Sequence, residues 1–282
     1  MKRLLPLAAL IVASTGAAIV FLAQSAPATA PADLPPSEAA ARARLNASPR
    51  HGEFVTVKVP GIDTPIKCYI VHPSRADKAP VVIVTMEIYG LSDWLMATTD
   101  QLAADGFIAI APYYLSGKGP NGGGTEAFAD RTAVTRAVSG LDTALVISVN
   151  NAVADYATKL PNATDKFANV GFCWGGGKSF AYAAAQPKLA AAVVYYGMPP
   201  ADPDLAKITC PVLAFYPTLD NRTTATEKPT EDKMKALGKT FTGKIEQGAT
   251  HGFLRAQTTP ADIQATKEAW PLTIQLLKDS MK

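Results

Sequence analysis

The sequence predicts one α/β domain in which a mainly parallel sheet carries helices on both faces. Its short β-branched runs are apolar without alternation, which is typical of strands buried on both faces. Helix-like segments separate these runs, as parallel strands require. Residues 31–282 are enough for one such domain with a sizeable core.

The chain begins with an export signal, predicted over residues 1–30. Basic Lys2 and Arg3 precede an apolar run from Leu4 to Leu22, and Ala28-Thr29-Ala30 matches an A-x-A cleavage site. We therefore expect a periplasmic or secreted protein. The alternative is an uncleaved membrane anchor, because the run is long for a signal and close to a membrane span. No later stretch is apolar for long enough to insert stably.

Residues 31–50 are interpreted as a linker and a short N-terminal extension, and residues 51–282 as the domain. Proline and alanine dominate from Pro27 to Pro36, and Ser37 to Leu45 is a candidate short helix. Glu53–Val59 and Thr64–Val71 follow as strands. The turn residues between them predict an antiparallel pair.

Strands and helices then alternate to the C-terminus. The predicted strands are Val81–Val84, Phe107–Ile110, Phe167–Gly171, Ala190–Tyr195, Val212–Tyr216 and Phe241–Glu246. The predicted helices are Trp94–Ala104, Ser139–Ala157, Gly177–Gln186, a segment near Thr230–Leu237, and Ala261–Leu277. In such sheets the site lies at the carboxyl ends of the strands, and the glycine-rich stretch from Gly117 to Gly124 is expected to be a mobile loop near that rim.

Charge and cysteine content exclude two classes of protein. Lys and Arg number 27 against 24 Asp and Glu, so no basic stripe is available for a nucleic acid. Three scattered cysteines are too few for a disulfide scaffold. Cys68 and Cys210 lie in apolar runs and are predicted to be buried small hydrophobes. Cys173 lies among glycines and needs another explanation.

Gly171-Phe172-Cys173-Trp174-Gly175 has the spacing of a G-x-S-x-G nucleophile elbow with sulfur in place of oxygen. It stands between a predicted strand and a predicted helix, where flanking glycines let a strained turn close. A tightly packed turn without chemistry is the alternative. A phosphate-binding loop at Gly175 to Ser179 is disfavoured, because Phe172 occupies the position of that motif's first glycine.

The base and its orienting acid follow by elimination among few candidates. His51 belongs to the extension and His72 ends an early strand, which leaves His251 in a loop between the last strand and the last helix. Asp220 follows the next-to-last strand and would hold the imidazole in the required tautomer. Asp202 and Asp204 are poorer choices because they follow the preceding strand. Nucleophile, acid and base in this order are typical of the α/β-hydrolase fold.

The same motifs resemble the dienelactone hydrolase family. The resemblance rests on Gly171 to Gly176, Asp220, His251-Gly252-Phe253 and Met86 to Gly90. It implies a cysteine triad with an oxyanion hole from the backbone N–H groups of Trp174 and Ile88, the positions at which this fold places such donors.

The resemblance also implies roles for three charged side chains. Glu87 would keep the Cys173 thiol protonated until an anionic substrate binds. Arg255 would receive a substrate carboxylate. Arg131 is the best match for a second arginine of this kind, with Arg136 nearly as good, because the segment from Tyr113 to Leu141 departs from the family pattern.

These features predict a hydrolase of a small ester or enol-lactone that bears a carboxylate, acting through a thioester. We expect a monomer without cofactor or metal, because no residues have metal-ligand spacing. One alternative is a general carboxylesterase or thioesterase of neutral substrates. The other is a catalytically inactive α/β-hydrolase fold that binds or senses thiols.

Overall fold

An eight-stranded sheet organises residues 34–282, the part of the chain that the computed structural model describes. The predicted export signal lies outside these residues. In sheet order, the strands are β1 (Glu53–Val59), β2 (Ile62–Val71), β4 (Ile108–Pro112), β3 (Ala79–Thr85), β5 (Ala163–Phe172), β6 (Ala192–Tyr195), β7 (Val212–Pro217) and β8 (Phe241–Glu246).

The pairing confirms the mainly parallel sheet. β1 and β2 form the predicted antiparallel hairpin, and β2 also runs antiparallel to β4. All pairs from β4 to β8 are parallel. β3, β6 and β7 are buried along nearly their whole length, which explains why their sequences are apolar without alternation.

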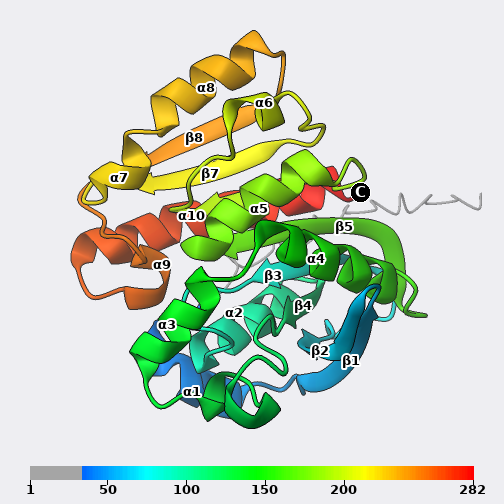
Figure 1. Cartoon of the computed structure of the whole chain (residues 1–282). Coiled ribbons are helices and arrows are strands. Elements are labelled where there is room, and N and C mark those ends of the chain that lie inside the picture. The colour runs from blue at the N-terminus through cyan, green and yellow to red at the C-terminus, as the bar shows by residue number, and fades with distance from the viewer. Residues whose placement is uncertain (1–33) are drawn as a thin grey trace, which may run out of the picture. The chain divides into compact units, whose positions relative to one another are not determined.

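Helices cover both faces of the sheet. They are α1 (Glu38–Ala47), α2 (Asp93–Ala104), α3 (Arg131–Ser139), α4 (Thr143–Ala157), α5 (Trp174–Ala185), α6 (Asp202–Leu205), α7 (Asn221–Thr224), α8 (Glu227–Ala236), α9 (Phe253–Ala256) and α10 (Pro260–Ser280). Figure 1 shows α4 and α5 in front of the strands and α10 behind them. The helix expected in the N-terminal extension is α1, which packs against α2 and α9.

The helix predicted over Ser139–Ala157 is α4, but it begins only at Thr143, and the nine-residue α3 before it has no counterpart among the predicted helices. α3 ends at Ser139, and α4 begins at Thr143 after a bend of 89°. The side chain of Asp142 accepts a hydrogen bond from the Ala144 N–H at 3.0 Å and so caps the new helix. Gly140 and this capping residue mark the start of α4 in the sequence, and the predicted start at Ser139 lies before both of them.

Smaller differences concern short elements. α6, α7 and α9 have four residues each and were not predicted, because one turn leaves no periodic pattern. The glycine-rich stretch expected as a loop holds a short 3₁₀ turn at Pro120–Gly122, and a second such turn follows it at Thr125–Ala127. Within residues 34–282, no single helix has the length and apolar composition needed to cross a bilayer; only the bent pair α3 and α4 would pass together.

Candidate active site

Cys173 stands at the sharp turn between β5 and α5. Its backbone has φ 56° and ψ −115°, a conformation that costs energy for any residue except glycine. The turn is held by the Cys173 N–H, which donates to the Tyr195 carbonyl at 3.0 Å. The backbone is therefore the strained strand–turn–helix that the G-F-C-W-G pattern predicts.

The flanking glycines are needed because other backbone approaches them closely. A Cβ atom on Gly171 would lie 2.0 Å from the carbonyl oxygen of Gly175. A Cβ atom on Gly175 would lie 2.3 Å from the carbonyl oxygen of Met86. Neither space admits a methyl group, so any side chain would force the elbow open.

The fold brings His251 and Asp220 to the nucleophile. His251 lies between β8 and α9, and its Nε2 is 3.0 Å from the Cys173 Sγ. Its Nδ1 is 2.6 Å from Oδ2 of Asp220, which follows β7. Thr223, the third residue of α7, donates to the same Oδ2 at 2.6 Å. A proton can thus pass between sulfur and imidazole while the carboxylate fixes the ring.

Burial sets the resting state of the thiol. Burial, together with the nearby Glu87 charge, raises the pKa of Cys173 to about 11, although the backbone N–H groups of Trp174 and Ile88 and the Arg222 charge oppose the rise. Burial alone would also raise the pKa of Asp220, but the hydrogen bonds from Thr223 and His251 lower it overall. At neutral pH the site therefore holds a thiol and an ionised aspartate.

The two predicted oxyanion donors flank the sulfur. Trp174 is the first residue of α5, and Ile88 lies in the segment after β3. Both N–H groups interact favourably with the Cys173 thiolate form. They converge on the place where negative charge would develop during attack on a carbonyl.

Glu87 is buried behind the nucleophile and paired with Arg255. Glu87 Oε2 lies 2.8 Å from Arg255 Nε, although that N–H bond is not aligned with the oxygen. The hydroxyl of Tyr196 donates to Oε1 at 3.4 Å. Burial raises the pKa of Glu87 to about 7, against the lowering effect of Arg255. The glutamate is thus poised to change charge near neutral pH.

Arg131 and Arg255 meet on one aromatic ring. The Arg131 and Arg255 guanidinium carbons lie 3.6 Å and 5.0 Å from the centre of the Tyr89 ring. Both arginines contact the carboxylate of Glu38, from the first turn of α1. Together with Ile88 and Tyr89 they line a hollow of about 490 Å³, whereas Arg136 is exposed on α3 and does not line it. We call Arg131 and Arg255 the arginine pair.

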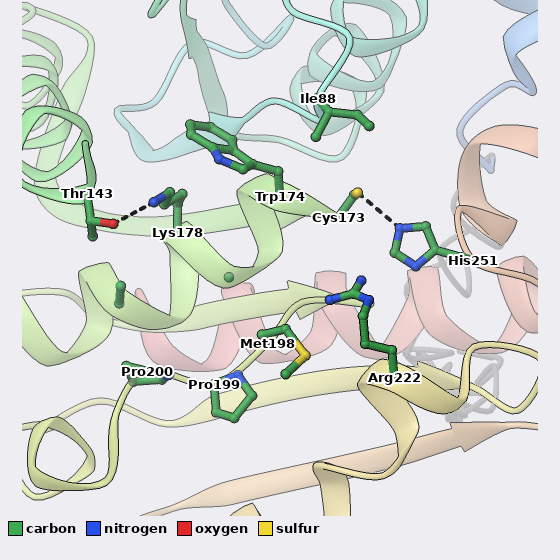
Figure 2. A pocket seen from close by; sticks show the side chains of 12 residues that line it. Ile88, Thr143, Cys173, Trp174, Lys178, Met198, Pro199, Pro200, Arg222 and His251 are labelled. Carbon is green, nitrogen blue, oxygen red and sulfur yellow. Dashed lines mark hydrogen bonds between the residues drawn. The ribbon is translucent and has the colours of Figure 1, made fainter. Parts of the chain in front are cut away.

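A larger cavity of about 580 Å³ opens beside Cys173 (Figure 2). Its apolar wall comes from Trp174, Met198, Pro199, Pro200 and neighbouring residues. Ile88 lines both this cavity and the arginine hollow, so the two spaces adjoin at the oxyanion loop.

The cavity contains two cations that were not among the predicted site residues. Arg222 on α7 lies beside His251, and its Nη2 is 4.0 Å from Asp220 Oδ2. Lys178 on α5 donates to Thr143 Oγ1 at 2.5 Å at the opposite end (Figure 2). The position of Arg222, two residues after the orienting acid, was a usable signal. Lys178 was considered only as part of a phosphate loop.

The remaining candidates lie elsewhere. His72 pairs with Asn162 at the surface, 3.0 Å from its amide nitrogen, and His51 is exposed. Asp202 and Asp204 form exposed ion pairs with lysines. Cys68 and Cys210 are buried and unpaired, as predicted. Among residues 34–282 no group of three or more His, Cys, Asp or Glu side chains is arranged to hold a metal ion.

Comparisons with known proteins converge on one family. Residues 66–281 match the model of the "Dienelactone hydrolase family". A protein of Escherichia coli O157:H7 named "Putative carboxymethylenebutenolidase" is 32% identical over 60% of this chain and 64% of its own length, so the match spans less than two thirds of that relative. A relative with the same name from Synechocystis sp. is 29% identical over 80% of this chain and 96% of its own length.

A solved structure supports the fold. The crystal structure of a "Putative Dienelactone Hydrolase" from Klebsiella pneumoniae superposes on this chain with a TM-score of 0.71. It covers 82% of this chain and 99% of its own, at 24% sequence identity. At that identity the likeness concerns the α/β-hydrolase fold alone.

Proposed function

Because the chain belongs to the dienelactone hydrolase family, we propose that it hydrolyses a small ester or enol-lactone that bears a carboxylate, with Cys173 as the nucleophile. One observation carries the proposal: Sγ, the imidazole and the Asp220 carboxylate form a continuous hydrogen-bonded chain at 3.0 Å and 2.6 Å on a strained elbow. A structural cysteine would need neither the strain nor the aligned base.

The proposed reaction has two acyl-transfer steps. Sγ attacks the carbonyl carbon as its proton moves to His251 Nε2, and the N–H groups of Trp174 and Ile88 hold the oxyanion. The C–O bond then breaks, the leaving oxygen takes the proton from His251, and a thioester remains. Water attacks the thioester and gives its proton to Nε2. Finally the C–S bond breaks, the carboxylic acid leaves, and the thiol is restored.

The substrate carboxylate is proposed to bind the arginine pair. Arg255 is 16% exposed in its side chain, so a carboxylate there would be partly desolvated. Burial would lower the pKa of Arg255, but Glu87 and Glu38 raise it, so the guanidinium stays charged. A bidentate carboxylate–arginine contact contributes about 1.5–3 kcal/mol, which is about ten- to a hundredfold in specificity.

A panel of substrates tests both levels of the proposal. The wild-type protein and the Cys173→Ala, Arg255→Ala and Arg255→Lys variants are assayed with a carboxylated lactone, its methyl ester and nitrophenyl esters. Cys173→Ala should abolish all turnover while the fold survives. Arg255→Ala should lower kcat/KM for the carboxylated lactone only. Arg255→Lys should recover part of the loss, because lysine keeps the positive charge but cannot bind a carboxylate through two parallel N–H groups.

The alternatives predict other results. A general esterase would prefer the neutral ester, and Arg255→Ala would affect both substrates alike. A non-catalytic thiol-binding protein would show no turnover with any ester. Undiminished turnover by folded Cys173→Ala would exclude the cysteine mechanism itself.

A further inference from the structure

A carboxylate of the chain itself already occupies the arginine pair. Glu38 Oε1 lies 3.3 Å from Arg131 Nη2, and its Oε2 contacts Arg255 Nη1. The two oxygens of one carboxylate thus bridge both guanidinium groups above the Tyr89 ring. This is the arrangement that a bound substrate carboxylate would be expected to adopt.

The local charge is balanced while Glu38 is in place. When ionised, Glu38 and Glu87 supply two negative charges against the two positive charges of Arg131 and Arg255. Glu87 is 5% exposed in its side chain and is held by its burial, whereas Glu38 is 42% exposed. Glu38 is therefore the carboxylate that can leave. Its departure would give the hollow a net positive charge.

The helix that carries Glu38 is lightly held. Of the ten residues of α1, only Ala41 is buried, and Ser37 at its N-terminus makes no side-chain capping bond. Its anchors include backbone carbonyls that accept hydrogen bonds: Pro36 from Trp94 at 3.1 Å and Pro35 from Gln257 at 3.0 Å. A segment with so little buried apolar surface opens at a low free energy.

We propose that Glu38 determines specificity by competing with the substrate carboxylate for the arginine pair. The inference rests on the proposed function and adds an intramolecular competitor to it. A tethered group acts at an effective concentration on the order of millimolar. An anionic substrate must therefore displace Glu38, and its affinity is lower than it would be for an arginine pair without Glu38. A neutral substrate does not use the pair and is unaffected.

Removal of the Glu38 charge tests the competition. Glu38→Gln keeps the size of the side chain but removes the ionic partner, so KM for a carboxylated lactone should fall about tenfold. KM for its methyl ester and kcat for both should stay unchanged. Glu38→Ala should give the same pattern, and it provides a second variant if the glutamine folds poorly.

The matched control is Arg42→Gln. Arg42 lies one turn further along α1 and pairs with Asp93 at 2.7 Å. This variant loosens the helix without removing the competing carboxylate, so its KM for the carboxylated lactone should stay near wild type. An equal fall in KM for Arg42→Gln would overturn the competition, since loosening of α1 alone would then suffice.

The other outcomes are equally decisive. An unchanged or increased KM for the carboxylated lactone in the folded Glu38 variants overturns the inference, as does an equal fall for the methyl ester. In each of these cases wild-type turnover that depends on Cys173 leaves the hydrolase proposal intact. Absence of turnover with every ester would instead refute the proposed function.

Discussion

If the proposed mechanism holds, replacement of His251 by alanine should leave the rare Cys173 thiolate as the only reactive form of the nucleophile. The imidazole Nε2 lies 3.0 Å from Sγ and is the group placed to take the thiol proton. Burial raises the pKa of that thiol to about 11. At pH 7, four pH units lower, about one molecule in ten thousand carries the thiolate. Without the base, kcat/KM should therefore fall about ten-thousandfold, which is about 5 kcal/mol of lost transition-state stabilisation.

The pH dependence of the residual activity separates this mechanism from simple damage to the site. Above pH 8, where Glu87 stays ionised, the thiolate fraction grows about tenfold per pH unit below the thiol pKa, so log kcat/KM of His251→Ala should rise with a slope of about one between pH 8 and 9.5. A nitrophenyl ester is the right substrate, because its leaving group needs no proton. Added imidazole should restore part of the rate by filling the vacated space.

The control for this experiment is the double variant with Cys173→Ala, which should reduce the rate to the uncatalysed background at every pH. A loss smaller than tenfold at pH 7 would show that His251 is not the base. A residual rate that is flat with pH would show that the thiol is already ionised, contrary to the effect of burial.

Two further predictions concern the thiol and the elbow. Glu87→Gln should speed alkylation of Cys173 by iodoacetamide, because a negative charge that raises the thiol pKa is removed. Since the pKa of Glu87 is about 7, the two rates should differ most above pH 8 and converge below pH 6, where the wild-type carboxyl is protonated; equal rates across the range would rule out control by Glu87. Gly175→Ala should lower Tm by about 5–10 °C through overpacking, because its Cβ would meet the Met86 carbonyl oxygen at 2.3 Å. Gly177→Ala in the same helix, where the nearest atom is 3.4 Å away, should leave Tm unchanged or raise it, and similar Tm values for both variants would contradict the packing argument.

The order of elements was predictable because the burial of each element is visible in its own hydrophobic pattern. The apolar runs of β3 and β7 indicate strands covered on both faces, and the glycine pattern around Cys173 indicates a tight turn. Elimination among three histidines left His251. The nine residues of α3 were not predicted as a helix, because only Val134 and Val138 among them are buried and their apolar pattern is short.

Local sequence patterns were enough to predict the fold class, the elbow and the three side chains that meet there, because strand burial and a strained glycine-flanked turn leave such patterns. The surroundings of these side chains depend on contacts between distant segments. Glu38 meets Arg255 across 217 residues of sequence, and Arg222 enters the cavity from a one-turn helix. No periodicity encodes such contacts. They arise when folding of the sheet brings the ends of distant strands and the N-terminal helix together, so that charges from separate segments pair.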